Sequence, residues 1–221
     1  MAEATIGRGA PGRKRVPRAE REREMLMSAA ELFAERGYNA VSMEAIAGAC
    51  GVTKPLLYSY FGSKEELFVA CAEKSGEALR ERVREVVHAP GSADERVWRG
   101  LLAVFAFVEH HRRSWRLLYP PGGRPAGLVG EGADRARRDM AALIEALMAD
   151  IALERGLPEA AASQLWPLAL LFTDLTTAAA SEWAENATEP KELAALRVMN
   201  LTWLGFDRML GGEAWLPALR R

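Results

Sequence analysis

Apolar residues recur every three or four positions along most of the chain, which is the spacing of one face of an α-helix. The first stripe begins near Ala19 and continues through Leu26, Ala29 and Phe33, and Gly37 follows as a predicted left-handed cap. No segment alternates apolar and polar residues for long enough to predict a strand. The pattern therefore predicts an all-α protein.

Short helices with clear capping residues follow. Ser42 precedes a helix predicted over residues 43–50, and Thr53 precedes a second helix that ends before Gly62. Ser and Thr oxygens accept hydrogen bonds from the first free backbone N–H groups of a helix. Pro55 stands in the first turn of the second helix, where a missing N–H is tolerated. The two helices and the turn between them predict a helix-turn-helix unit.

Longer helices are predicted after this unit. Ser63, with Glu66 three residues later, has the spacing of a capping box and predicts a helix to about His88. Gly/Pro-rich breaks at residues 120–132 and 156–158 interrupt the later pattern. Further helices are predicted over residues 92–112, 114–118, 131–155, 158–186 and 189–210.

These elements divide the chain into an arm and two domains. Residues 1–18 are rich in Gly, Pro and Arg, so we expect a flexible basic arm, either solvated or in contact with nucleic acid. Residues 19–65 form the predicted helix-turn-helix domain, and residues 66–221 form a larger helical domain. Residues 1–64 carry ten Lys/Arg and seven Asp/Glu, whereas the remainder carries nineteen and twenty-three. The first part can therefore meet a polyanion.

The composition argues against several classes of protein. The longest apolar runs fall short of the ~18 residues of a membrane helix, and the basic start has no apolar core of a signal peptide. Cys50 and Cys71 lie in apolar helical patterns without C-x-x-C spacing, so we expect buried thiols. We therefore expect a cytoplasmic protein without a cofactor.

An enzyme on a helical scaffold is a remote alternative. Such an enzyme needs a nucleophile with its base, or ligands at metal spacing. The histidines are His88, His110 and His111, and the adjacent pair points in different directions from a helix. We therefore expect neither catalysis nor a metal site.

Polar side chains gather at the front of the second short helix. In a helix-turn-helix this helix enters the major groove, and its first turns reach base edges. A lysine there can donate to guanine or phosphate, apolar residues can contact a thymine methyl, and tyrosine hydroxyls can reach phosphate. Tyr60 also fits an ordinary core position. The predicted DNA-binding residues are Ser42, Thr53, Lys54, Pro55, Leu56, Tyr58, Tyr60 and Lys64.

Residues 21–68 resemble the DNA-binding domain of TetR-family transcriptional regulators. The resemblance includes the stretch AAELFAERGYNAVSMEAIAGACGVTKPLLYSYFGSKEELF, which begins at Ala29. Two departures from the family pattern are Pro55, where glycine is common, and Tyr60, where histidine is frequent. The first makes the expected base contact more apolar, and the second preserves a phosphate contact.

The resemblance implies a homodimeric repressor that binds a near-palindromic DNA operator and is released by a small molecule, which we expect from the pocket residues below to be largely apolar. The two recognition helices would then lie roughly 34–36 Å apart, one turn of DNA. The helical C-terminal domain is implied to bind this effector and to supply the dimer contact. An activator, or a regulator that needs no ligand, remains the alternative.

The effector pocket is predicted from aromatic residues with few polar groups, a composition that suits an apolar cavity and also an ordinary core. Asp174 stands among apolar neighbours, so we expect it to meet an arginine across an interface or a polar ligand group. The predicted ligand-binding residues are Trp98, Phe105, His110, Trp115, Tyr119, Phe172, Thr173, Asp174 and Thr176.

The last two predicted helices are apolar on more than one face. Such helices are buried on two sides, either by a partner subunit or inside a larger monomeric bundle. We interpret the second face as the dimer contact. The predicted interface residues are Trp166, Leu170, Ala178, Leu196, Trp203 and Phe206.

Overall fold

The structure is a computed structural model that describes residues 17–119, 127–157 and 165–211. Every regular element within these ranges is an α-helix, which confirms the predicted fold class. Most of the predicted basic arm lies outside the described residues, as do the first residues of the helix predicted over 158–186. The helices are α1 Arg18–Arg36, α2 Met43–Ala49, α3 Lys54–Phe61, α4 Lys64–Val87, α5 Ala93–His110, α6 Arg112–Leu118, α7 Leu128–Glu154, α9 Trp166–Asn186 and α10 Lys191–Leu210.

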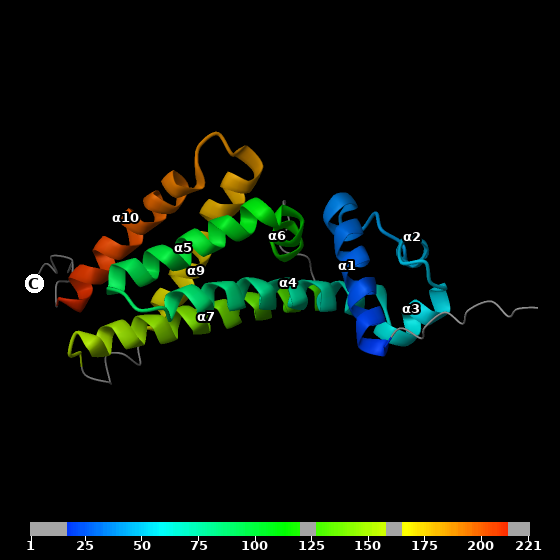
Figure 1. Cartoon of the computed structure of the whole chain (residues 1–221), viewed down its shortest axis with the longest axis horizontal. Helices are drawn as coiled ribbons and strands as arrows, with labels where there is room; N and C mark the ends of the chain where they lie inside the picture. The colour runs from blue at the N-terminus through cyan, green and yellow to red at the C-terminus, as the bar shows by residue number, and fades with distance from the viewer. Residues whose placement is uncertain (1–16, 120–126, 158–164, 212–221) are drawn as a thin grey trace, which may run out of the picture.

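The molecule is elongated, with α1, α2 and α3 at one end and α5, α7, α9 and α10 toward the other (Figure 1). Helix α4 extends from the first group into the second, where it packs along α7 and α5. Helix α1 packs on both α4 and α6. The two ends are therefore joined by α4 and by the contact of α6 with α1.

Side-chain caps fix the short N-terminal helices. Ser42 Oγ accepts from the Ala45 N–H at 3.1 Å, and Thr53 Oγ1 accepts from the Leu56 N–H at 3.4 Å. Both predicted caps are confirmed. Because each cap satisfies a backbone donor that the helix leaves free, α2 and α3 each have a defined start.

The capping box predicted at the start of α4 forms only in part. Ser63 Oγ accepts from the Glu66 N–H at 3.0 Å, but the Ser63 N–H donates to the Phe61 carbonyl at 2.8 Å instead of to Glu66. A reciprocal box occurs at the start of α5, where Glu95 Oε2 accepts from the Ser92 N–H at 3.0 Å. The predicted start of α4 is thus confirmed, whereas the box at Ser92 was not predicted.

Gly37 ends α1 through a bond from its N–H to the Phe33 carbonyl at 2.9 Å. Its φ of 77° is positive but its ψ of 158° is extended, so the left-handed helical cap predicted here is wrong in its ψ angle. Glycine is still favoured, because other residues rarely adopt this φ.

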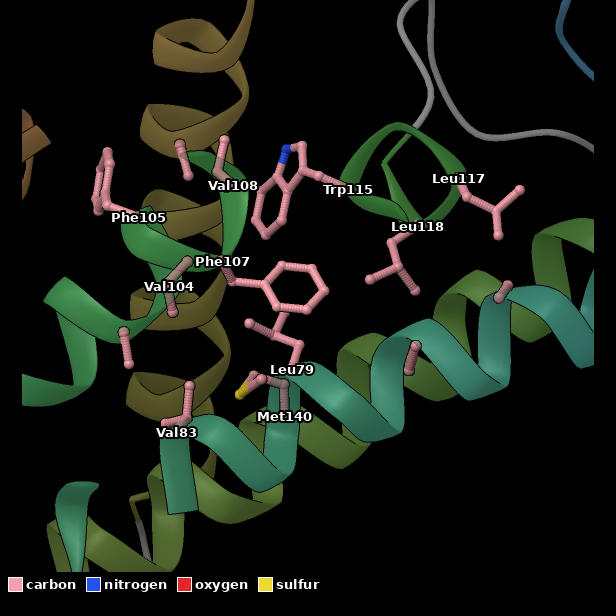
Figure 2. Close-up of a cluster of buried hydrophobic side chains, with 14 of the residues drawn as sticks. Leu79, Val83, Val104, Phe105, Phe107, Val108, Trp115, Leu117, Leu118 and Met140 are labelled. Atoms are coloured by element: carbon pink, nitrogen blue, oxygen red, sulfur yellow. The ribbon is translucent and has the colours of Figure 1, made fainter. Parts of the chain in front are cut away.

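Two regions of one apolar core hold the ends of the molecule. At the N-terminal end, Met25, Phe33, Ile46, Leu57 and Leu67 are buried together. The Phe33 and Phe68 rings meet edge to face, with centroids 5.1 Å apart. In the larger domain, α4, α5, α6 and α7 bring their apolar side chains to one place (Figure 2). The labelled residues there are Leu79, Val83, Val104, Phe105, Phe107, Val108, Trp115, Leu117, Leu118 and Met140.

The two cysteines differ in burial. Cys71 is fully buried with its Sγ 3.5 Å from the Leu26 carbonyl, and burial raises the pKa of its thiol to about 12. Cys50 is only half-buried, so the prediction of a buried thiol is confirmed for Cys71 alone. No helix in the described ranges is long and apolar enough to cross a membrane. The same ranges contain no cluster of metal-ligating side chains.

Candidate nucleic-acid interface and apolar cavity

The front of α3 is exposed on a helix whose back is anchored. Thr53, Lys54 and Pro55 are exposed, whereas Leu57 is fully buried and Phe61 is nearly so. The anchors face the N-terminal core because α3 positions one turn apart share a face. The structure thus leaves the first turn of α3 open, as the helix-turn-helix interpretation requires.

Lys54 is held by an ion pair in the unbound protein. Its Nζ donates to Glu44 Oε1 of α2 and lies 5.8 Å from the centre of the Tyr58 ring. The hydrogen bond lowers the pKa of Glu44 and raises that of Lys54. Glu44 therefore competes for the positive charge that would meet DNA. Sequence reasoning missed this residue, because the pairing joins two helices.

The remaining α3 candidates differ in exposure. Tyr58 is 40% exposed. Leu56 and Tyr60 are half-buried and pack against the core, which agrees with the core alternative for Tyr60. The guanidinium of Arg18 lies 4.9 Å from the centre of the Tyr60 ring. The start of α1 is thereby placed beside the end of α3.

Lys64 belongs to a small cluster at the start of α4. Its Nζ lies 4.3 Å from the centre of the Tyr38 ring, and the Tyr38 hydroxyl donates to Glu65 Oε1 at 2.6 Å. Burial, followed by the bond to Glu65, raises the pKa of Tyr38 to about 12. Tyr38 thus positions Lys64, a role that its place after Gly37 did not reveal.

An apolar cavity lies among the helices from α4 to α10. Its volume is about 50 Å³, room for a few water molecules. Side chains from α4, α5, α6, α7, α9 and α10 form its walls. The lining residues are Leu79, Val83, Val87, Val97, Gly100, Leu101, Val104, Trp115, Tyr119, Met140, Ile144, Leu147, Met148, Phe172, Thr173, Thr176, Thr177, Thr202, Trp203 and Phe206.

The structure brings some of the predicted pocket residues to this cavity. Trp115, Tyr119, Phe172, Thr173 and Thr176 line it. The Trp115 and Tyr119 rings lie 4.4 Å apart between centroids, so the end of α6 presents a paired aromatic surface.

Three other predicted pocket residues lie elsewhere. Phe105 is buried against Trp183, with ring centroids 5.9 Å apart, and Trp98 is half-buried outside the lining. His110 is exposed at the end of α5, where its Nδ1 lies 2.8 Å from the Ala106 carbonyl. The structure therefore does not bring these three residues to this cavity. Helical periodicity did not separate cavity walls from core.

Asp174 also lies outside the cavity lining. It accepts two hydrogen bonds from the Arg137 guanidinium of α7, which joins α7 to α9 within the chain. The predicted arginine partner is therefore present, but in the same subunit. A bidentate arginine–carboxylate pair of this kind is among the stronger charge-assisted contacts.

Helices α9 and α10 each carry a second apolar face. On α10, Ala194, Ala195 and Val198 are buried, while Leu193, Leu196, Leu201 and Leu204 on the other side are exposed. On α9, Leu171 is 66% exposed and Ala178 is exposed. Apolar residues that gather on an exposed face are typical of interaction surfaces. We call these α9 and α10 residues the outer apolar face.

The predicted dimer residues divide between this face and the interior. Leu196 and Ala178 belong to the outer apolar face. Trp203 and Phe206 line the cavity instead, and Phe206 is nearly fully buried, so it has little surface left for a partner. Trp166 and Leu170 are half-buried. Leu201 and Leu204, absent from the predicted set, are among the most exposed apolar residues.

Helix α6 connects the cavity to α1. Trp115 lines the cavity and donates from Nε1 to Ser181 Oγ of α9 at 3.1 Å. Two residues earlier, Arg113 forms an ion pair with Glu35 of α1 at 3.0 Å. A displacement of α6 by a molecule in the cavity would therefore bear directly on α1.

Comparison with known proteins agrees with this arrangement. Residues 26–71, which span the end of α1 through the first part of α4, match the family described as bacterial regulatory proteins, tetR family. The HTH-type transcriptional activator FasR of Mycolicibacterium smegmatis is 37% identical over 105 residues, 48% of each chain. The HTH-type transcriptional repressor KstR2 of Mycobacterium tuberculosis is 35% identical over 91 residues, 41% of this chain and 46% of that one.

Similarity to solved structures extends further along the chain. A TetR-like transcriptional regulator from Rhodococcus sp. RHA1 is 28% identical, with a TM-score of 0.67. The match covers 87% of this chain and 99% of that chain. The chain spans about half the length of the curated relatives it matches.

Proposed function

This chain belongs to the TetR family of bacterial transcriptional regulators, and from that membership we propose that it is a homodimeric repressor released from DNA by a small molecule. The observation that carries the proposal is the pairing of an open α3 front with an apolar cavity in one chain. The first is a surface for DNA, and the second is a site for an effector.

Contacts to DNA are proposed for the first turn of α3 and its surroundings. Lys54, Pro55 and Tyr58 are exposed. We propose that Lys54 donates to a base edge, that Tyr58 donates to a phosphate, and that Pro55 makes an apolar contact with a base. Ser42 and Lys64, at the starts of α2 and α4, flank this surface. Phosphate binding is favoured there because N-terminal N–H groups and the helix dipole attract anions.

Dimerisation is proposed through the outer apolar face. Leu193, Leu196, Leu201 and Leu204 of α10 lie on the side opposite its buried residues, and α9, which packs on α10, exposes Leu171. A helix that is apolar on two sides is normally covered on both. A second copy of the chain provides such a cover and brings two α3 helices to the two half-sites of an operator.

Release is proposed to follow from differential binding. An effector shifts the protein away from the DNA-binding conformation only as far as it prefers the other one. The cavity of about 50 Å³ is smaller than pockets for drug-sized ligands, roughly 300–1,000 Å³, so occupancy requires the walls to move. Trp115 of α6 and Tyr119, the residue after α6, line the cavity, and Arg113 of α6 forms an ion pair with Glu35 of α1.

Activation in place of repression is the second candidate. FasR is an activator and KstR2 is a repressor, and both match the chain over less than half of its length. The same DNA-binding surface serves either outcome. An in vitro transcription assay on the selected operator separates them by the sign of the effect.

The proposal is tested by selecting bound DNA from a random pool and measuring affinity by fluorescence anisotropy. Lys54→Ala combined with Tyr58→Phe is expected to weaken operator binding by about 10- to 100-fold, from lost base and phosphate contacts. Lys74→Ala removes an exposed α4 lysine that pairs with Glu77 and serves as the matched control. Unchanged affinity in the double variant would contradict the DNA-contact assignment.

The dimer is tested separately by analytical ultracentrifugation. Leu201→Glu combined with Leu204→Glu is expected to give a folded monomer, because like charges then meet across the outer apolar face. Operator affinity should fall with it, since one α3 helix contacts only a half-site. A wild-type chain that sediments as a monomer would refute the dimer.

A further inference from the structure

One polar atom in the cavity wall has no hydrogen-bond partner among the described residues. The Thr176 hydroxyl of α9 is buried and unpaired. Thr173, one turn earlier in the same wall, donates its hydroxyl to the Ala169 carbonyl at 2.7 Å. A buried polar group without a partner is unfavourable, so a bound molecule that offers an acceptor or donor to Thr176 removes that penalty.

The described walls of the cavity carry no charge. None of the lining residues is Asp, Glu, Lys, Arg or His. Moving a charged group from water into such walls is costly unless an opposite charge meets it. The cavity therefore discriminates against a ligand that must bury a carboxylate, a phosphate or an ammonium group.

Most arginines next to lining residues in the sequence are paired with carboxylates, whereas Arg99 donates to the Pro90 and Ala89 carbonyls and its Nε has no partner among the described residues. Arg80 lies 3.3 Å from Asp139, and Arg96 donates to Glu154 at 2.7 Å. Arg137 interacts electrostatically with Tyr119, a cavity residue, but holds Asp174 through two hydrogen bonds. An anionic head group would have to displace the Asp174 carboxylate from Arg137.

The space available favours an apolar body. Met140 and Met148 line the cavity, and methionine side chains adapt readily to a new occupant. A groove of about 240 Å³ lies beside the cavity and shares part of its wall. The shared residues are Met148, Phe172, Thr202 and Phe206. Movement of these side chains would lengthen the cavity without exposing a charge.

We propose that the effector is an uncharged, largely apolar molecule with one hydrogen-bonding oxygen that pairs with Thr176. The inference rests on the proposed effector function of the cavity and names the chemical class of its ligand. Alcohols, ketones and esters belong to this class, whereas free carboxylates and coenzyme A thioesters do not.

The test compares ligands that share one hydrocarbon chain and differ in the head group. Decanol, decanoate and decanoyl-coenzyme A are titrated into the full-length protein by calorimetry near about pH 7.5, where decanoate is ionised. Decanol is expected to bind at least about ten-fold more tightly than either anion. Tighter binding of decanoate or decanoyl-coenzyme A overturns the proposal.

Matched variants locate the hydrogen bond. Thr176→Val keeps the shape but removes the hydroxyl, and it is expected to weaken decanol binding about three- to ten-fold. Thr188→Val makes the same change at an exposed threonine outside the cavity and should leave decanol affinity unchanged. Diphenylhexatriene has no hydrogen-bonding atom, so its affinity should be the same in both variants. Equal loss of decanol affinity in both variants overturns the proposal.

The outcomes separate this inference from the proposed function. Preference for decanoate that disappears in Arg137→Gln assigns an anionic effector, so the cavity remains an effector site and only the chemical class is wrong. Failure of diphenylhexatriene and of every chain-bearing ligand to bind shows that the cavity takes no effector. In that case the effector part of the proposed function fails as well, whatever the protein does with DNA.

Discussion

The front of α3 depends on a few neighbouring residues, whereas the cavity depends on six helices that are far apart in the sequence. Thr53 caps α3 by accepting a hydrogen bond from the N–H of Leu56, three residues later. Leu57 and Phe61 of α3 are buried and anchor the helix. The cavity wall instead joins Val83 of α4 to Phe206 of α10. This difference explains why the front of α3 is recognisable as a sequence motif, whereas the cavity is not.

The two regions also differ in how well they are filled. Leu57 is fully buried in the N-terminal core, while Leu147 borders the cavity and has empty space on one side. Side chains in a filled core contact neighbours on every side, whereas a cavity wall has already lost some of those contacts. We therefore expect that shortening a buried side chain destabilises the protein more in the N-terminal core than in the cavity wall.

The largest expected effect is on stability. Leu57→Ala should lower the free energy of unfolding by about 2–5 kcal/mol, because it removes buried methyl groups and leaves a new cavity. Urea denaturation followed by circular dichroism measures the loss. Operator binding should fall in parallel, since the anchor of α3 is gone.

Leu147→Ala is the matched control for that comparison. The same atoms are removed, but the space adjoins an existing cavity, so the loss should lie at the lower end of the range, about 2 kcal/mol. Operator binding without effector should be nearly unchanged. A larger loss in Leu147→Ala than in Leu57→Ala would break the distinction between a filled end and a hollow one.

The same contrast explains what the sequence could predict. Helix starts at Ser42, Thr53 and Ser63 depend on contacts three residues away, so the spacing alone located them. Phe206 was assigned to the dimer because α10 is apolar on two sides, and periodicity does not say which side faces inward. Thr202 was not predicted to line the cavity, since its partners come from other helices.

An intermediate effect is expected where the two regions meet. Arg113→Met removes the ion pair between α6 and Glu35 of α1, which contributes at most about 1 kcal/mol to stability at an exposed site. Ligand binding in the cavity should be unchanged, but the ligand should release the operator less effectively. We expect the coupling free energy between ligand binding and operator binding to fall by about 1 kcal/mol. The ratio of operator affinities without and with ligand should then change roughly five-fold.

Arg82→Met provides the comparison for this change. Arg82 is equally exposed on α4 but pairs with Glu85 of its own helix, so its loss should leave release intact. Titrating the ligand of the cavity into the protein–operator complex by anisotropy gives both ratios. If the ligand still releases the operator fully from the Arg113→Met variant, then ligand binding in the cavity acts on α1 through α4 and not through α6.

The smallest expected effect is at the α3 front. Glu44→Gln frees Lys54 from its ion pair, so operator affinity should rise about three-fold, and the dependence on salt should steepen by up to about one phosphate contact. Glu24→Gln removes the same charge from an exposed position on α1 and is the control. An equal rise in both variants would trace the effect to net charge. A rise in Glu44→Gln alone would show that a local ion pair, not the overall charge of the domain, restrains Lys54 before DNA arrives.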